Sequence, residues 1–108
     1  MNRSERLSGK LELRAQILKA LAHPTRLLFV EELGKGERCV CELQGMVDLD
    51  MSTVSKHLSV LKGVGLVTDQ KRGNQVFYTL QTPCILRIFD CVEQAVRANL
   101  QKQVEIFR

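Results

Sequence analysis

The chain has 108 residues with 16 basic and 12 acidic side chains, a formal net charge of +4, and four cysteines. Hydrophobic residues make up 44% of the chain, an ordinary proportion for a globular protein. No apolar stretch reaches the roughly 18 residues that a membrane span needs. These values predict a single soluble domain over residues 1–108 and exclude a membrane protein.

The first residues, MNRSERLSGKLEL, are charged and lack the apolar stretch of a secretion signal. We therefore expect a cytoplasmic protein. In a reducing cytoplasm, the four cysteines are expected to be thiols rather than disulfides.

The charge is distributed unevenly along the chain. Residues 28–50 carry six acidic and two basic side chains, whereas residues 51–75 carry four basic side chains and one acidic side chain. The second segment is therefore expected to face a polyanion.

Two helices are predicted in the first third of the chain, over residues 10–22 and from Pro24 to Leu33, because apolar residues recur there at helical spacing. His23 separates the two helices, because a residue before proline avoids the helical conformation. Pro24 suits the first position of the second helix.

Two more helices are predicted in the middle of the chain. The third is short and runs from about Cys39 to Val47. Asp50 is a suitable N-cap for the fourth, from Met51 to about Gly63.

A β-hairpin and a long last helix complete the expected order. The segments Leu66–Lys71 and Gln75–Leu80 alternate in polarity around the turn Arg72-Gly73-Asn74, as hairpin strands do. Thr82 and Pro83 then favour the start of a helix that runs to about Lys102.

The last helix carries an apolar face about 30 Å long, more than so small a core can bury. The first helix likewise has a second apolar stripe without a partner. We therefore expect a two-fold homodimer through both helices. The expected interface residues are Leu11, Leu18, Ile85, Phe89, Val92 and Val96.

The element order α-α-α-α-β-β-α, mainly helical with a small hairpin, is typical of a winged helix-turn-helix. Serines on the fourth helix are small enough to let it enter a major groove about 12 Å wide, and the polar hairpin tip can contact the backbone or the minor groove. The expected DNA contacts are Ser52, Thr53, Ser55, Lys56, His57, Ser59, Lys71, Arg72, Asn74 and Gln75. For His57, packing is an alternative role, and His23 is expected to be structural.

Four stretches of the sequence resemble the ArsR/SmtB family of metal- and metalloid-responsive repressors. They are LKALAHPTRLLFVEEL at 18–33, ERCVCEL at 37–43, DLDMSTVSKHLSVLKGVGLV at 48–67 and KRGNQVFYTL at 71–80. The resemblance implies a homodimer on a palindromic double-stranded operator near a resistance operon, released when an inducer binds. The family's ELCVCDL sensing motif corresponds to residues 37–43.

Cys39 and Cys41 open the predicted third helix, where free backbone N–H groups and Arg38 favour thiolates. On a regular helix, residues two apart point about 200° away from each other. We therefore expect that one ion bound by both sulfurs bends or unwinds the start of this helix and so reorients the recognition helix.

A third thiolate is expected, because arsenic(III) and antimony(III) prefer three. Gln44 stands where some relatives have a third cysteine, so the expected set is Cys39 and Cys41 plus either Cys84 or Cys91, from the same chain or the partner. The last helix contains no histidine, which argues against zinc, cobalt or nickel there.

The sequence thus predicts a transcriptional repressor with arsenite or antimonite as inducer and no organic cofactor. Two scattered histidines form no nucleophile and base pair, so an enzyme is not expected. Three alternatives stay open: a redox or persulfide switch with an inter-helix disulfide, cadmium or lead as inducer, and a thiol-based metal carrier without DNA function. A carrier would have no use for a wing and a serine-faced helix.

Overall fold

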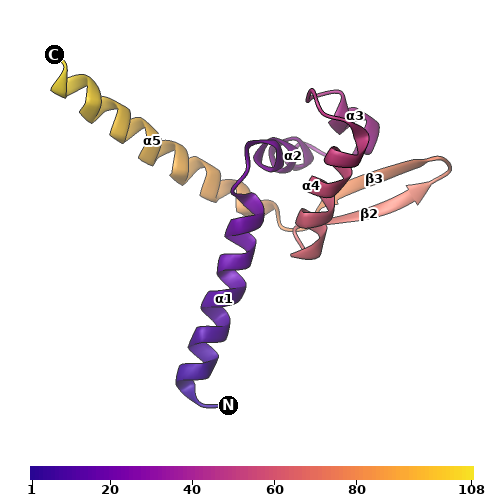
Figure 1. Ribbon diagram of the computed structural model, residues 1–108, viewed down its shortest axis with the longest axis horizontal. Helices are drawn as coiled ribbons and strands as arrows, with labels where there is room; N and C mark the ends of the chain where they lie inside the picture. The colour runs from indigo at the N-terminus through magenta and orange to yellow at the C-terminus, as the bar shows by residue number, and fades with distance from the viewer.

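The computed structural model describes residues 1–108, with two long helices projecting from a compact unit (Figure 1). The expected helices and hairpin are present in the expected order, with a short strand and a 3₁₀ turn added. The elements are α1 (Arg3–Leu21), α2 (Pro24–Gly34), β1 (Arg38–Cys39), α3 (Val40–Gln44), α4 (Met51–Gly63), β2 (Val67–Arg72), β3 (Gln75–Leu80), η1 (Pro83–Ile85) and α5 (Leu86–Ile106).

The first helix is longer than predicted, because it begins at Arg3 rather than at residue 10. The Asn2 side chain caps it by accepting a hydrogen bond from the Glu5 amide at 2.8 Å. Residues 3–9 are all exposed, so the apolar periodicity used for the prediction is absent there. A polar cap, rather than burial, defines this end.

The boundary between α1 and α2 follows the prediction. Pro24 occupies the start of α2, and His23 is its extended N-cap, whose Nδ1 accepts a hydrogen bond from the Thr25 amide at 3.1 Å. At the other end of α2, Gly34 leaves room for α5, since a Cβ at this position would lie 2.5 Å from Leu86 Cδ1.

The sheet has three antiparallel strands in the order β1-β3-β2. Its hairpin turns at Gly73, whose φ of 62° favours glycine, and the register places Arg72 opposite Gln75. The strand β1 was not predicted, because two residues carry no alternating pattern. It pairs Cys39 with Phe77 on β3.

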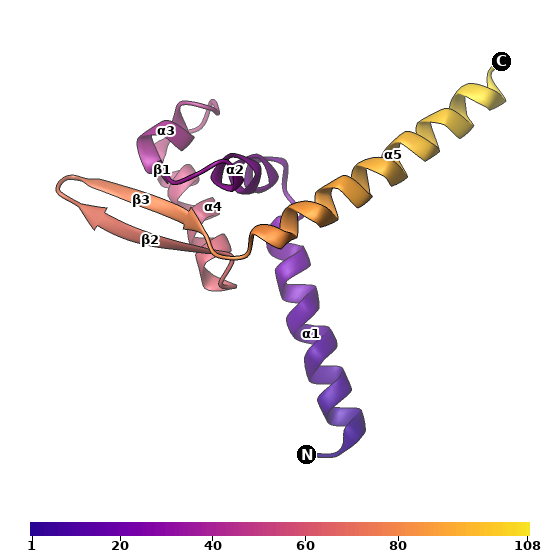
Figure 2. The ribbon, with the colours of Figure 1, turned by 180° about the vertical axis from the view of Figure 1, so that it is seen from behind.

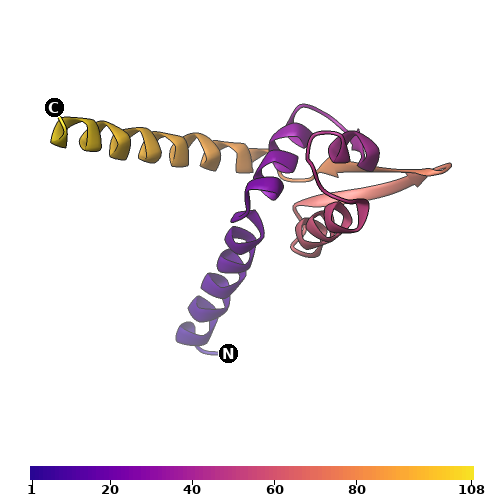
Figure 3. The ribbon, with the colours of Figure 1, turned by 45° about the horizontal axis from the view of Figure 1, so that its top comes forward.

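The core lies between the helices α2, α3 and α4 and the sheet. Figure 3 shows these helices gathered beside the hairpin, away from the free ends of α1 and α5. The α4 residues Val54, Leu58 and Leu61 have no exposed surface, as their spacing of four and three residues predicted. Ile85 of η1 joins this core and is 8% exposed, so its expected place in a dimer interface is wrong. The 3₁₀ turn directs it inward before α5 begins.

The helices α1 and α5 extend away from the core in different directions (Figures 1 and 2). No residue of α5 is buried, and only Ala20 and Leu21 of α1 are. The radius of gyration is 17.1 Å, compared with about 13 Å for a compact domain of this length. None of the helices is both long enough and apolar enough to pass through a membrane.

Candidate DNA-binding surface and cysteine pair

The helix α4 presents a small polar face to solvent. Asp50 caps it, because its carboxylate accepts a hydrogen bond from the Thr53 amide at 2.8 Å and lies 3.2 Å from Ser52 Oγ. Hydrogen bonding by Thr53, first from its side chain and then from its amide, holds the pKa of Asp50 below its usual value. Four of the expected contact residues on this helix are exposed: Ser52, Ser55, Lys56 and Ser59.

His57 and Thr53, expected to contact DNA, are only half-exposed. The His57 Nδ1 accepts a hydrogen bond from Arg26 Nε at 3.1 Å, and its ring lies 4.3 Å from that of His23. Partial burial, followed by the charges of His23 and Arg26, lowers the pKa of His57. The structure therefore gives His57 the packing role, at the contact between α2 and α4.

All four wing residues expected to contact DNA, namely Lys71, Arg72, Asn74 and Gln75, are exposed. Arg72 is nevertheless engaged, because its guanidinium forms a bidentate ion pair with Glu37 at 2.6 and 2.8 Å. Lys62, at the end of α4, is similarly paired with Asp69 at 2.9 Å. Of the four basic residues in the segment 51–75, only Lys56 and Lys71 are free of ion pairs.

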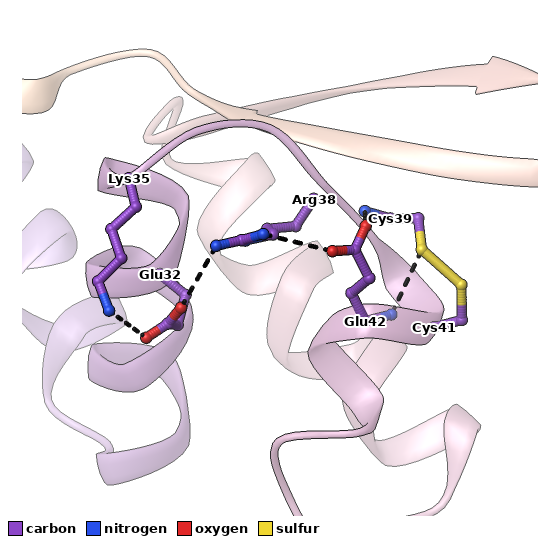
Figure 4. Close-up of polar contacts among 6 residues, drawn as sticks. All are labelled: Glu32, Lys35, Arg38, Cys39, Cys41 and Glu42. Atoms are coloured by element: carbon purple, nitrogen blue, oxygen red, sulfur yellow. Dashed lines mark hydrogen bonds and ion pairs between the residues drawn. A yellow bond between two sulfur atoms is a disulfide. The ribbon is translucent and has the colours of Figure 1, made fainter.

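Cys39 and Cys41 lie side by side and are joined by a disulfide (Figure 4). Cys39 is the N-cap of α3, in an extended conformation, and is 4% exposed, whereas Cys41 is exposed. The Cys39 sulfur accepts a hydrogen bond from the Glu42 amide at 3.3 Å, and the Glu42 carboxylate accepts one from the Cys39 amide at 3.2 Å. The pair is therefore part of a capping box.

This geometry corrects two expectations. Cys39 precedes the helix instead of lying on it, so the 200° separation of a regular helix does not apply, and the two Cα atoms are only 5.4 Å apart. Both sulfurs can therefore bind one ligand without unwinding of α3. The two cysteines are also oxidised in the structure rather than free thiols, while Cys84 and Cys91 are free and exposed.

The structure does not assemble the expected three-thiolate site within one protomer. Nowhere do three cysteine, histidine, aspartate or glutamate side chains lie close enough together to hold a metal ion. Cys84 lies in η1 and Cys91 lies on α5, whereas the disulfide lies at the start of α3. A third sulfur from a partner subunit stays a prediction.

The ion-pair and capping partners around the cysteine pair were not predicted from the sequence. Arg38 lies between two carboxylates, 3.4 Å from Glu42 and 3.8 Å from Glu32 (Figure 4). Glu42 had a sequence signal, since it follows the N-cap by three residues as in a capping box. Glu37 had none, because its partner Arg72 is 35 residues away.

The projecting helices expose the apolar residues expected at an interface. Leu11, Leu18, Val92 and Val96 are each between 52% and 55% exposed, while Phe89 is half-buried against the core. Between α1, α2 and α5 lies a groove of about 730 Å³, lined by Leu18, Leu27, Ile88, Phe89 and Val92 among others. These faces have no covering element within the chain.

The short helix α3, the polar-faced α4 and the wing β2–β3 define a winged helix-turn-helix. Residues 23–69 match the family described as bacterial regulatory protein, arsR family. The chain belongs to this family, whose regulators are not enzymes, as expected.

Relatives of known name support this assignment. The chain is 35% identical over 96 residues to the arsenical resistance operon repressor of Escherichia coli (strain K12), a match covering 86% of this chain and 80% of that protein. It is 39% identical over 70 residues to the HTH-type transcriptional repressor SmtB of Mycobacterium tuberculosis (strain ATCC 25618 / H37Rv), covering 65% of this chain and 52% of that repressor. The chain thus matches about half the length of SmtB.

A solved structure has the same fold. The homodimeric winged helix-turn-helix DNA-binding domain of Mb0332 from Mycobacterium bovis, described as a possible ArsR-family transcriptional regulator, aligns with a TM-score of 0.77. The identity is 29%, and 94% of each chain is covered. The fold and the order of its elements are therefore those of this family.

Proposed function

We propose that this protein is a homodimeric transcriptional repressor of the bacterial cytoplasm, whose affinity for a palindromic operator falls when an inducer binds Cys39 and Cys41. The observation that carries the proposal is the position of the sulfur pair. It lies at the N-terminus of α3, which packs against the polar-faced helix α4. A ligand on the sulfurs therefore acts on the first helix of the DNA-binding motif.

DNA binding is supported by the exposed face of α4. Its serines leave room for the helix in a major groove, and Lys56, free of any ion pair, can reach a phosphate or a guanine. Lys71, Asn74 and Gln75 on the wing are suited to the adjacent backbone or minor groove. Each phosphate contact adds to the salt dependence of binding.

Dimerisation is supported by the uncovered apolar faces of α1 and α5 and by the homodimeric state of the similar Mb0332 domain. A two-fold dimer presents two α4 helices to two half-sites, so its operator is palindromic. A groove of about 730 Å³ is large enough to receive side chains of the partner subunit.

We propose arsenite or antimonite as the inducer. Soft ions prefer thiolate ligands, and the reduced Cys39 and Cys41 supply two sulfurs that already lie together. The donor set of one protomer fits such an ion only in part, since the third sulfur is absent from the site. Cys84 or Cys91 of the partner subunit would complete it.

The test is a gel-shift titration of reduced protein with arsenite. Cys39→Ser and Cys41→Ser should each bind the operator like the wild type but fail to release it. Cys84→Ser and Cys91→Ser identify the third sulfur, since the variant that lacks it should also fail to release the operator. Release of the double variant Cys39→Ser/Cys41→Ser at wild-type arsenite concentrations contradicts the proposal.

The disulfide favours a second candidate, a repressor controlled by oxidation. The exposed Cys41 is accessible to an oxidant. When the disulfide forms, the two thiols give up two electrons and two protons, and the oxidant takes them up. The bond joins neighbouring residues rather than two helices, unlike the switch considered from the sequence. Titration with hydrogen peroxide, a persulfide donor and cadmium beside arsenite separates these candidates by which agent dissociates the complex.

A further inference from the structure

Among side chains near the tip of the wing, Arg72 makes the direct contact with the segment that carries the cysteines. Its two guanidinium nitrogens donate to the two carboxylate oxygens of Glu37 at 2.6 and 2.8 Å, and one of them also reaches Gln70 Oε1 at 3.0 Å. The guanidinium carbon lies 4.8 Å from the centre of the Phe77 ring. Arg72 is thus held both by the carboxylate of Glu37 and by the ring of Phe77.

Two of the three partners of Arg72, Glu37 and Phe77, are attached to the segment that holds the cysteines. Glu37 precedes Cys39 by two residues, and Phe77 is paired with Cys39 across β1 and β3. Thr79 of β3 adds a contact to the same carboxylate at 3.4 Å. A movement of Cys39 therefore displaces the groups that position Arg72.

The geometry makes this ion pair stronger than an ordinary surface contact. Exposed ion pairs generally contribute little, but a bidentate arginine and carboxylate pair fixes both position and orientation. Stacking on an aromatic ring restricts the guanidinium further. The side chain of Glu37 is 35% exposed and that of Arg72 is 47% exposed, so each charged group is only partly accessible to water.

We propose that Glu37 and Arg72 form a clamp that transmits the state of the Cys39–Cys41 pair to the wing. Arg72 is then a positioning residue of the wing instead of a free phosphate contact, and Glu37 is its counterpart on the effector segment. This inference rests on the proposed function only in taking the cysteine pair as the effector site.

The experiment measures the wing directly, without DNA. Amide chemical shifts of residues 71–75 are recorded for the full chain carrying Cys84→Ser and Cys91→Ser, before and after the pair is oxidised with diamide. Diamide takes two electrons and two protons from the two thiols, giving the disulfide and a hydrazine. We expect the wing amides to shift on oxidation, and the shift to fall at least threefold when Glu37→Gln is added.

Two further variants separate the clamp from a simple effect of charge. Arg72→Lys keeps the positive charge but cannot form the bidentate pair, so its wing response should also fall at least threefold. Lys71→Gln removes a neighbouring charge that has no ion-pair partner. Its change in wing amide shifts on oxidation should stay within a factor of 1.5 of the change seen without this substitution. Unchanged core shifts verify that each variant is folded.

Two results overturn the inference. The wing amides could fail to respond to oxidation, or they could respond equally with Glu37→Gln, in which case the backbone pairing of β1 and β3 alone carries the change. Operator affinity, measured in parallel on the chain that keeps all four cysteines, tests the proposed function separately. If oxidation and arsenite leave affinity unchanged while the clamp variants still abolish the wing response, the proposed function fails and the clamp stands.

Discussion

The core and the projecting helices of this protein differ in how far they bury their apolar side chains. In the core, seven large side chains from α2, α3, α4 and β2 are fully buried within a single chain. Along α5, by contrast, five apolar residues are between 41% and 60% exposed, namely Ile88, Val92, Val96, Leu100 and Val104. The comparison shows that one chain completes the DNA-binding unit, whereas α1 and α5 need a second chain.

The largest expected effect tests the core. Leu58→Ala, on α4, should lower the free energy of unfolding by about 2–5 kcal/mol, because it removes buried methyl groups and leaves a cavity. Val60→Ala on the same helix, where the side chain is 39% exposed, should change it by only about 0.5 kcal/mol. Urea denaturation measures both, and equal losses would contradict the burial assigned to α4.

The next effect tests the projecting helices. Val96→Glu should raise the dissociation constant of the dimer by about 100-fold or more, because it places a charge in an apolar contact. Gln94→Glu adds the same charge on the opposite side of α5 and should leave the constant nearly unchanged. Sedimentation equilibrium measures the constant, and similar results for the two variants would exclude this face as the interface.

A smaller effect is expected at the start of α4. Asp50→Ala should cost about 1 kcal/mol of stability, because it removes the acceptor for the Thr53 amide. Asp50→Asn, which keeps an oxygen acceptor, should retain most of that contribution. Thermal unfolding at neutral pH provides the comparison, and equal destabilisation by the two variants would show that the carboxylate charge, not the cap, is what matters.

The smallest effect concerns the contact between α2 and α4. Because the folded state lowers the pKa of His57, its contribution to stability is complete above the unfolded pKa of 6.5 and declines as the pH falls below that value. Protonation would also displace the Arg26 hydrogen bond. Between pH 7.5 and 5.5, the wild type should therefore lose more unfolding free energy than His57→Gln. An identical loss in both would mean that folding does not lower the pKa of His57.

The predictable part of the fold depends on contacts between residues close in sequence. The caps at His23 and Asp50 and the turn at Gly73 involve residues at most a few positions apart, so the sequence contains each complete signal. The burial of one face of α4 follows from apolar spacing in the same way. These local features were sufficient to predict the order of the elements and the polar face of α4.

The candidate site was predictable as a list of residues but not as an arrangement. The extended N-cap at Cys39 brings it beside Cys41, and a spacing of two residues is equally compatible with sulfurs on opposite sides of a helix. Ile85 fits an apolar stripe on a helix, yet the 3₁₀ turn places it in the core. In both cases the backbone conformation of one or two residues decided the outcome.

The amino-acid sequence alone determined the winged helix-turn-helix, its capped helices and its surplus of apolar surface, because periodicity and capping act over a few residues. Only the tertiary structure paired Arg72 with Glu37, Lys62 with Asp69, and His57 with Arg26. The last two pairs span 7 and 31 residues, and the first spans 35. Such partners are selected by the packing of strands and helices, which brings together charges that no local pattern relates.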